Sequence, residues 1–397
     1  MKILMLTPYL PYPPSSGGQI RSFNLIKELS KKHDITLYSL IKYDSERKFV
    51  NHLEQYCRQV KVFKRTTKPW TVKNIWKTAT SKYPFLVIRN YSPEEREEIK
   101  KLLDSHKFDL IHAETFYVSP HIPQTDIPIV LVDQTIEYQV YQHYVSNFKW
   151  KVLTPLLSID VAKIKYWEEH YWKRASRVVA VSEADALKMR SLVKGLQVDV
   201  VPNGVGEDLI EETAVHYNKT VLFMGNYAWL QNIEAAKILA HQVFPEVLNK
   251  IPDAKLIIAG QNTDKIEGLE GKNVLMLNLS IEDIQGVKDA YQTSGVLVAP
   301  LYGPGGTRLK ILGAMAAKLP VVTTDVGIEG IEAEHNHDVL VGKTPKELAD
   351  LTIKVLNNKE LYTQIAKNAR MLVDKKYSYQ SIAQKLNNIY QEVTKNA

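Results

Sequence analysis

The sequence predicts an α/β protein made of two doubly wound domains, each with a parallel sheet. Short runs of β-branched and apolar residues alternate along the whole chain with stretches of helical periodicity, which is the rhythm of successive βαβ units. Several of these runs are apolar nearly throughout, as expected for parallel strands that are covered on both faces. The length of 397 residues exceeds what one hydrophobic core usually supports, so we expect two domains.

The apolar runs place the expected strands. In the first half of the chain they are residues 2–8, 34–40, 59–65, 110–114, 128–134, 177–183 and 198–204. In the second half they are residues 220–226, 254–261, 273–278, 295–301, 320–325 and 337–342. Helical patterns separate most of them, and the clearest are residues 19–32, 232–251, 308–318 and the terminal 377–395.

The domain boundary is expected after the turn formed by Pro202, Asn203 and Gly204, because a polar stretch follows it and a new strand begins at Thr220. We therefore predict a first domain over 1–205, a second over 206–375 and a C-terminal helical segment over 376–397. Open α/β sheets bind ligands at the carboxyl ends of their strands. Two such domains facing each other would hold a ligand in the cleft between them.

Composition excludes few functions. There are 51 Lys and Arg against 44 Asp and Glu, and this mildly basic balance fits an acidic ligand or an anionic membrane surface as well as an ordinary solvated surface.

Cys57 is the single cysteine, so no internal disulfide can form. The N-terminus is not a signal peptide, since its apolar run is short and ends in prolines. No run approaches the ~20 apolar residues that span a bilayer. No nucleic-acid-binding module is recognisable.

The strongest functional signal is the loop at residues 303–310. Gly305 and Gly306 precede Thr307, which is placed as a helix N-cap, and Arg308 and Lys310 fall in the first helical turn. Cations are repelled by the positive end of the helix dipole, so two cations at this position indicate that an anion binds there. Backbone amides, a guanidinium and an ammonium together are suited to a diphosphate. The alternative is that both cations only face solvent.

Other strand ends carry polar residues. Gly17 and Gly18 lie directly before a helix, where glycines allow a phosphate or sugar close to the backbone, although a flexible loop would look the same. His112 and Glu114 end the strand 110–114 and are candidates for catalysis or for a structural pair. Gln134 and Glu137 follow the next strand and could orient hydroxyl groups.

Two segments, 62–77 and 147–157, interleave aromatic and basic residues. A surface helix carrying Trp and Lys suits a membrane interface, whereas a lid or a helix packed by its tryptophans is an equally open alternative. We find no zinc or serine-hydrolase motif and no Asp-x-Asp that would hold a metal nucleotide. We therefore expect no metal and no cofactor.

In order and spacing, the segments "SSGGQIR", "FDLIHAE", "RVVAVSEADA", "VVPNGV", "VLFMGNYAWLQNIEAA", "AKLIIAG" and "GTRLKILGAMAAKLPVVTTDVGIEGI" resemble one large family. It comprises the retaining, nucleotide-sugar-dependent glycosyltransferases of GT-B fold, family four, the group-one relatives. The resemblance covers nearly the whole chain. It implies a Rossmann-like acceptor-binding first domain, a Rossmann-like donor-binding second domain, and a final helix that crosses back to the first domain.

The resemblance also implies roles for individual residues. The catalytic candidates are His112 and Glu114. The donor-binding candidates are Gly17, Gly18, Gly225, Asn226, Asn232, Gly305, Gly306, Thr307, Arg308, Lys310, Gly313 and Glu329. The acceptor-binding candidates are Tyr9, Gln19, Gln134 and Glu137.

Gly305 and Gly313 stand where many relatives carry two glutamates, which contact the transferred sugar and the ribose hydroxyls. Loss of the first is shared with a "GTRLK" subgroup, but loss of the second is not expected there. Gly313 has three readings: a lost ribose contact in a crippled enzyme, room for a different donor contact, or easier packing. Many relatives also place an Arg and a Lys where Asn226 and Asn232 stand, and we expect Arg308 and Lys310 to supply that charge.

The expected activity is transfer of a hexose from a UDP- or GDP-sugar to a hydroxyl of a glycan or lipid-linked acceptor, without metal and with retention of configuration. Polysaccharide biosynthesis and a cytoplasmic location fit the resemblance, with peripheral contact to the cytoplasmic face of a membrane left open. The alternatives are a degenerate, non-catalytic sugar-nucleotide or glycan-binding protein and a nucleotide-sugar epimerase on the same scaffold.

Overall fold

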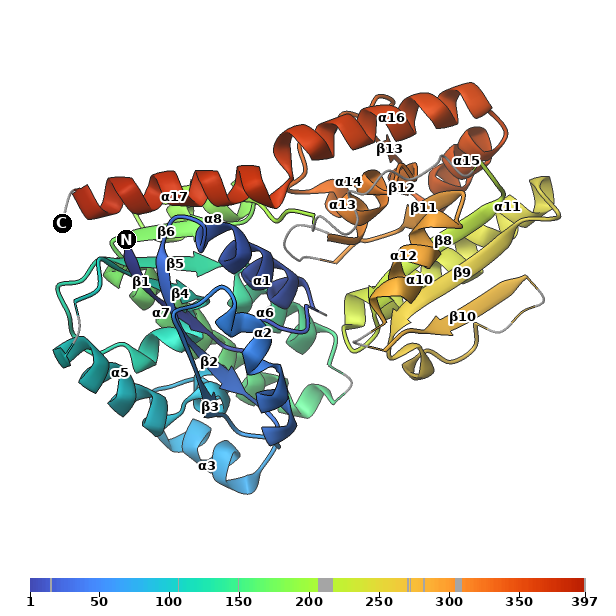
Figure 1. Cartoon of the computed structure of the whole chain (residues 1–397). Helices are drawn as coiled ribbons and strands as arrows, with labels where there is room; N and C mark the ends of the chain where they lie inside the picture. Colours follow the sequence, from blue (N-terminus) through green and yellow to red (C-terminus); the bar gives the residue numbers. More distant parts are fainter. Residues whose placement is uncertain are drawn as a thin grey trace. The chain divides into compact units, whose positions relative to one another are not determined.

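The computed structural model divides the chain into two compact units, and the chain enters the first unit twice (Figure 1). The first unit comprises Met1–Pro202 and Ala383–Ala397, and the second comprises Asn203–Ile382. The structure describes residues 1–14, 16–105, 107–148, 150–205, 217–269, 271, 273–280, 283–303 and 309–395. Both units are parallel α/β structures, so the predicted fold class is confirmed.

The first unit is built on a seven-stranded sheet in the order β3-β2-β1-β4-β5-β6-β7, with every described pairing parallel. Its strands are β1 (Lys2–Thr7), β2 (Asp34–Ile41), β3 (Gln59–Lys64), β4 (Leu110–Glu114), β5 (Ile129–Asp133), β6 (Arg177–Ala180) and β7 (Val198–Val200). Strand β1 pairs with both β2 and β4, so the order of strands reverses between β1 and β4. Such a reversal leaves a crevice at the carboxyl ends of the two strands.

Helices connect these strands. They are α1 (Gly17–Leu29), α2 (Val50–Glu54), α3 (Val72–Thr80), α4 (Phe85–Asn90), α5 (Pro93–Ser105), α6 (Glu137–Ser146), α7 (Thr154–Arg174) and α8 (Glu183–Leu192). Short 3₁₀ turns are η1 (Asp44–Phe49), η2 (Phe116–His121) and η3 (Lys151–Leu153). Helix α1 is capped at its N-terminus by the residue just before it, since the Ser16 hydroxyl accepts a hydrogen bond from the backbone amide of Gln19.

The second unit repeats the plan with six parallel strands in the order β10-β9-β8-β11-β12-β13. They are β8 (Thr220–Asn226), β9 (Lys255–Gln261), β10 (Val274–Asn278), β11 (Val296–Ala299), β12 (Val321–Thr323) and β13 (Leu340–Val341). The order reverses between β8 and β11. Its α-helices are α10 (Leu230–Ile238), α11 (Phe244–Lys250), α12 (Ile284–Gln292), α13 (Leu309–Ala316), α14 (Asp325–Ile328), α15 (Pro345–Leu356) and α16 (Lys359–Lys376), with a 3₁₀ turn η5 (Thr263–Lys265). The last helix, α17 (Tyr379–Lys395), is shared by the two units.

One predicted helix is interrupted. The stretch 232–251 forms α10, a π-helical segment η4 (Leu239–Val243) and α11. Pro245 occupies the first turn of α11 and has no amide hydrogen, so the regular ladder of the preceding turn cannot continue through it. The periodicity of apolar residues alone did not reveal this change of pitch.

Helix α17 begins in the second unit and its residues from Ala383 onward belong to the first. Ile382, Leu386 and Tyr390 are at most 1% exposed, and they recur at helical spacing. Within the first unit the helix is fixed by polar contacts as well, since His33 and Asn387 form a buried side-chain hydrogen bond of 2.8 Å. The C-terminal segment is therefore part of the core of the first unit.

Candidate functional site

In the first unit a chain of buried polar side chains lies at the carboxyl end of β4, beside the reversal of strand order. His112 and Glu114 alternate along β4, so their side chains share one face of the sheet. The His112 Nε2 lies 3.1 Å from Glu114 Oε1, and its Nδ1 lies 2.5 Å from the Tyr390 hydroxyl of α17. Both side chains of the His112–Glu114 pair are fully buried.

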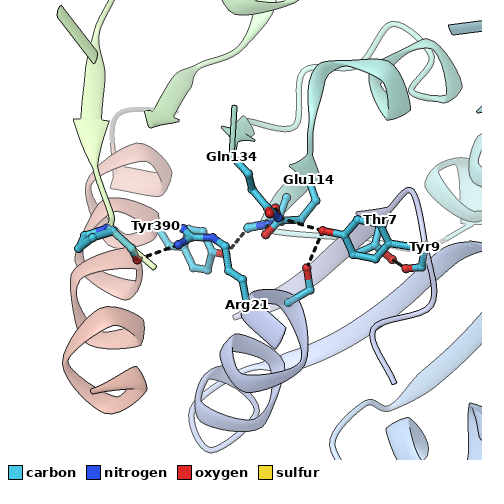
Figure 2. Close-up of polar contacts among 9 residues, drawn as sticks. Thr7, Tyr9, Arg21, Glu114, Gln134 and Tyr390 are labelled. Atoms are coloured by element: carbon cyan, nitrogen blue, oxygen red, sulfur yellow. Dashed lines mark hydrogen bonds and ion pairs between the residues drawn. The ribbon is translucent and has the colours of Figure 1, made fainter. Parts of the chain in front are cut away.

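The chain of contacts continues toward the surface through Gln134 and Tyr9. The Gln134 amide donates to Glu114 Oε2 at 2.7 Å and to the Tyr9 hydroxyl at 2.9 Å. Figure 2 shows Glu114 and Gln134 in the middle, with Arg21 and Tyr390 on one side and Thr7 and Tyr9 on the other. Tyr9 and Gln134 are half-buried. The predicted acceptor residues Tyr9 and Gln134 therefore lie in one cluster with the predicted catalytic pair.

Gly18 belongs to the same cluster, and its lack of a side chain has a clear reason. A Cβ at this position would lie 2.3 Å from the Tyr9 hydroxyl oxygen and 3.0 Å from Gln134 Oε1. The glycine lets the start of α1 pack directly on these two polar groups. Gly17 is exposed at the first position of the same helix.

The electrostatics keep Glu114 ionised. Burial raises the pKa of its carboxyl group, but the hydrogen bond and charge of His112, the charge of Arg21 and the Gln134 hydrogen bond outweigh burial, so the net pKa is lowered. Arg21 is fully buried on α1 and donates to the Pro202 carbonyl oxygen at 2.7 Å. With their polar atoms turned toward each other and toward Gln134 and Tyr390, His112 and Glu114 fit a positioning role, and direct catalysis by either remains a prediction.

The residue after Glu114 has an unusual backbone. Thr115 has a φ of 73°, in a region that a β-branched residue rarely adopts, and its amide is held by the Val132 carbonyl oxygen at 2.7 Å. Backbone strain of this kind collects where structure is over-determined around a functional site. It turns the chain sharply away from the end of β4.

The other two predicted acceptor residues, Gln19 and Glu137, form hydrogen bonds with other partners. The Gln19 side chain donates to the Leu10 carbonyl oxygen at 2.9 Å, which ties α1 to the loop after β1. The backbone amide of Glu137 donates to Glu168 at 2.6 Å, and the structure shows no hydrogen bond from Glu137 to the Gln134–Tyr9 cluster among the residues that it describes. Burial raises the pKa of the Glu137 carboxyl to about 7, with Asp133 adding to the increase and Arg89 opposing it.

In the second unit the predicted donor residues meet at the carboxyl ends of β8 and β9. Lys310, in the first turn of α13, donates to Asn232 Oδ1 at 2.5 Å, and its ammonium lies 4.7 Å from the centre of the Phe223 ring. The Asn232 amide donates in turn to the Asn226 carbonyl oxygen at 2.7 Å. The loop before α13 follows β11, so this cation lies at the reversal of strand order between β8 and β11.

The carboxyl ends of β8 and β9 pack closely at two glycines. A Cβ at Gly225 would lie 3.1 Å from the Asn232 side chain, and a Cβ at Gly260 would lie 1.9 Å from the Gly225 carbonyl oxygen. Asn226 is held by Gln261 at 3.0 Å and by Asn262 at 2.9 Å. The end of β8 is therefore a closely packed, hydrogen-bonded platform beneath Lys310.

Gly313 is explained by packing. It is buried in α13, and a Cβ there would lie 3.2 Å from both the ring and the hydroxyl oxygen of Tyr291. The Tyr291 hydroxyl donates to the Lys310 carbonyl oxygen at 3.3 Å. Of the three readings of Gly313, the packing one is supported, because Tyr291 fills the space that a larger side chain would need.

The remaining predicted donor residues are less well placed. Gly305, Gly306, Thr307 and Arg308 lie outside the described residues. Glu329 is exposed at the end of α14, in the loop beyond β12. Their assignment to the donor site remains a prediction.

Sequence reasoning missed Arg21, Tyr390 and Tyr291. The first two come from helices whose apolar stripes predict burial but give no signal that a polar residue on them reaches β4. Tyr291 is a residue of α12 that looks like any core aromatic. A positive φ at Thr115 also has no sequence signal, since threonine is a rare choice there.

Neither a metal centre nor a membrane span emerges from the described part of the chain. No group of three or more His, Cys, Asp or Glu side chains is arranged to hold a metal ion within it. None of its helices combines the length and the apolar character that crossing a bilayer requires.

Comparison with known proteins gives a consistent picture. Residues 218–358 match the family model of glycosyl transferases group 1, and residues 15–209 match that of glycosyltransferase family 4. An uncharacterised 44.6 kDa protein in the cps region of Klebsiella pneumoniae is 22% identical over 394 residues, covering 96% of this chain and 97% of that protein. An uncharacterised glycosyltransferase of Methanocaldococcus jannaschii is 25% identical, covering 80% of this chain and 84% of the relative. A phosphatidyl-myo-inositol mannosyltransferase of Mycobacterium leprae is 24% identical, covering 76% and 78%.

Solved structures support the same fold. Sucrose-phosphate synthase of Thermosynechococcus elongatus superimposes with a TM-score of 0.74 at 15% identity, covering all of both chains. Anabaena HepE, in complex with UDP and glucose, gives a TM-score of 0.66 at 16% identity and covers 99% of this chain and 100% of that one. The solved structures show that the chain has the GT-B fold, and the two family models show that it belongs to the group 1 glycosyltransferases of family 4.

Proposed function

We propose that this glycosyltransferase moves a hexose from a UDP- or GDP-sugar to a hydroxyl group of a glycan or lipid-linked acceptor. The observation that carries the proposal is the position of Lys310. Lys310 lies in the first turn of α13, at the strand reversal of the second unit, and its ammonium donates a hydrogen bond to Asn232 of α10. A cation at this point, beside the N-terminus of a helix, is suited to a diphosphate.

The chemistry follows from the leaving group. When the bond from the sugar to the diphosphate breaks, negative charge grows on the phosphate oxygens, and a preorganised cation stabilises that charge. Lys310 is preorganised because Asn232 and the Phe223 ring restrict its ammonium. Arg308 and the amides of Gly305, Gly306 and Thr307 are proposed to complete the phosphate site.

The donor and acceptor classes are supported by the relatives. HepE was solved with UDP and glucose, and a phosphatidyl-myo-inositol mannosyltransferase is among the relatives. We propose that the acceptor hydroxyl is oriented in the first unit by Tyr9 and Gln134, since these half-buried groups are backed by the ionised Glu114. Retention of configuration, independence of metal and a role in polysaccharide biosynthesis complete the proposal.

The deciding experiment measures binding and turnover separately. Binding of UDP- and GDP-sugars is measured by calorimetry for the natural chain, for Lys310→Ala, and for the control Lys367→Ala, an exposed lysine on α16 of the same unit. We expect Lys310→Ala to weaken donor binding by about tenfold or more, because a charged hydrogen bond contributes about 1.5–3 kcal/mol. The control should bind as the natural chain does. Equal affinity in all three would contradict the diphosphate assignment.

Turnover is then followed with the donor that binds best. Release of free nucleotide that depends on an added acceptor supports transfer, and the anomeric coupling in the product, read by NMR, tests retention. Activity that persists in EDTA supports independence of metal. Binding without turnover would favour a degenerate binding protein, and an isomerised donor would favour an epimerase.

A further inference from the structure

The first unit holds a cavity of about 1280 Å³ that is separate from the candidate site at the end of β4. Its lining comes from α3, from α4 and the turns beside it, from the start of α5, from the end of η2 and from the second half of α7. Tyr9, His112, Glu114 and Gln134 do not belong to the lining that the structure describes. Small-molecule pockets measure roughly 300–1,000 Å³, so the cavity has room for a longer ligand.

The cavity runs along the flank of the sheet from one edge to the other. Thr66 of the lining comes just after the carboxyl end of β3, whereas Arg174 comes just before the amino end of β6. In a parallel sheet all carboxyl ends share one edge and all amino ends share the opposite edge. A ligand that fills the cavity is therefore extended, and one of its ends lies at the edge that also carries Glu114.

The lining is strongly basic. No carboxylate belongs to the part of it that the structure describes, and its cations are Lys73, Lys77, Lys82, Arg96 and Arg174. None of these five side chains forms an ion pair with a carboxylate of the described residues. Burial lowers the pKa of His170, also in the lining, and the nearby charges of Arg174 and Lys82 lower it further. The cavity is therefore a region of uncompensated positive charge.

The two arginines of the lining are held by uncharged groups. Arg96 Nη1 donates to the Pro120 carbonyl oxygen at 2.6 Å, and Arg174 Nη2 donates to the Pro123 carbonyl oxygen at 3.2 Å. These hydrogen bonds position the guanidinium groups without neutralising their charge, and each bond uses one of the five N–H donors of its arginine. A positioned guanidinium is suited to a carboxylate or a phosphate.

Exposed aromatic rings line the same cavity. Tyr166 of α7 is 63% exposed, and Tyr91 is 36% exposed. The Tyr91 ring is stacked on the ring of the buried His121 at a centroid distance of 5.1 Å, so its exposed surface lies away from His121. The electron-rich face of an aromatic ring attracts the C–H groups of a sugar ring. Thr66 and Gln124 add a hydroxyl and an amide that suit sugar hydroxyl groups.

We propose that this cavity binds an extended acidic glycan, a saccharide chain that bears carboxylate or phosphate groups. The cations of the lining contact its acidic groups, and Tyr91 and Tyr166 contact its sugar rings. A small anion would leave most of the volume and both tyrosines unused, and a neutral glycan would leave the five cations without an anion. The proposal goes beyond the transfer reaction, since binding of the glycan at this second site needs no sugar donor.

The test is calorimetry with oligosaccharides of equal length, without any donor. Hexagalacturonate and a phosphorylated mannohexaose represent the two kinds of acidic group, and maltohexaose is the neutral probe. We expect at least one acidic probe to bind more tightly than maltohexaose, with an affinity that falls as salt rises. Lys73→Gln with Lys77→Gln should weaken that binding by about fivefold or more, because each exposed charge contact contributes modestly. Both lysines are exposed, so the double variant should fold normally.

Each substitution has a matched control outside the lining. Lys194→Gln with Lys385→Gln removes the same net charge from exposed positions of the first unit and should leave the affinity unchanged. Tyr166→Ala should weaken binding of the acidic probe by about threefold or more, because a sugar ring loses its aromatic contact. Tyr144→Ala, at a side chain that is 47% exposed on α6, should not weaken it. Circular dichroism confirms that all variants are folded.

The proposal is overturned if neither acidic probe binds, if maltohexaose binds as tightly as the acidic probes, or if control and test variants lose affinity equally. Tighter binding of hexauridylate than of either acidic probe, lost in Lys73→Gln with Lys77→Gln, would assign the cavity to nucleic acid and overturn the proposal as well. Donor binding, which is measured separately with Lys310→Ala, enters none of these outcomes.

Discussion

At the scale of single residues, Gly313 shows how packing and function can be confused. Its position in a helix costs roughly 0.5–1 kcal/mol relative to alanine, so it needs a reason. The ring of Tyr291 lies within 3.2 Å of where a Cβ would be, and the hydroxyl of the same tyrosine holds the backbone at Lys310. A glycine at 313 therefore allows α12 to support the first turn of α13.

We predict that Gly313→Glu destabilises the second unit by more than about 2 kcal/mol, because overpacking and a buried carboxylate both cost free energy. Gly313→Ala should cost less, since only one methyl group meets the ring. Urea unfolding measures both. An unchanged free energy of unfolding together with faster turnover in Gly313→Glu would restore the ribose-contact reading.

A second feature at the residue scale is the buried carboxyl group of Glu95 on α5. It is fully buried, the structure shows no hydrogen bond to either of its carboxyl oxygens, and burial raises its pKa to about 8. Burial lowers the pKa of the neighbouring His121 to about 4, so this pair is uncharged at pH 6. In the unfolded chain Glu95 ionises near its ordinary pKa of about 4.3.

We predict from this difference that Glu95 makes the protein less stable as pH rises. Between about pH 4.3 and pH 8 the folded state keeps a proton that the unfolded state has released, so the free energy of unfolding falls with pH over this window. Glu95→Gln should therefore raise the melting temperature more at pH 8 than at pH 5. Glu97→Gln, at an exposed position on the same helix, is the matched control. A gain that is equal at both pH values would show that ionisation of Glu95 is not the cause.

At the scale of elements, α17 matters because it supplies both apolar and polar contacts to the first unit. Its Tyr390 is 1% exposed and its hydroxyl meets His112 at 2.5 Å, while Asn387 meets His33. The candidate site of the first unit is thus supported by a residue 278 positions away along the chain.

We predict that Tyr390→Phe lowers the free energy of unfolding of the first unit by about 1–3 kcal/mol, because it leaves a nitrogen of the buried His112 without its partner. Tyr166→Phe, at a side chain that is 63% exposed in the same unit, should have little effect. Unfolding followed by hydrogen exchange on β4 reads the local change. Equal protection of β4 in both variants would mean that the tyrosine hydroxyl does not hold His112.

At the scale of the whole molecule, the same topology occurs twice, and each candidate site lies at a reversal of strand order. In the first unit the reversal lies between β1, which Tyr9 follows, and β4, which ends at Glu114. In the second unit it lies between β8, which contains Gly225, and β11, which precedes Lys310. The first unit is also discontinuous in sequence, since it comprises Met1–Pro202 and Ala383–Ala397. Its core therefore needs residues that precede the second unit and residues that follow it.

Every expected strand is present, although several end earlier than the sequence suggested. The runs 110–114 and 220–226 match β4 and β8 at both ends, because each is a buried parallel strand bounded by polar or turn residues. The expected strand 337–342 shrinks to Leu340–Val341 at the edge of the sheet, where only one neighbour pairs with it. The prediction of one continuous helix over 232–251 was wrong, because the pattern of apolar residues does not show where the hydrogen-bonding pitch of a helix changes.

The sequence by itself determined the class of fold, the alternation of strands and helices, and which loops carry the chemistry, because those depend on local periodicity and on glycines and cations at strand ends. It named Asn232 and Lys310, or Gln134 and Glu114, without showing that they touch. Only the tertiary structure decided which of them meet, that Tyr390 and Arg21 support the first cluster, and that Tyr291 accounts for Gly313. Those outcomes rest on contacts between residues far apart in the chain, and such contacts are set by how the elements pack rather than by any short stretch of sequence.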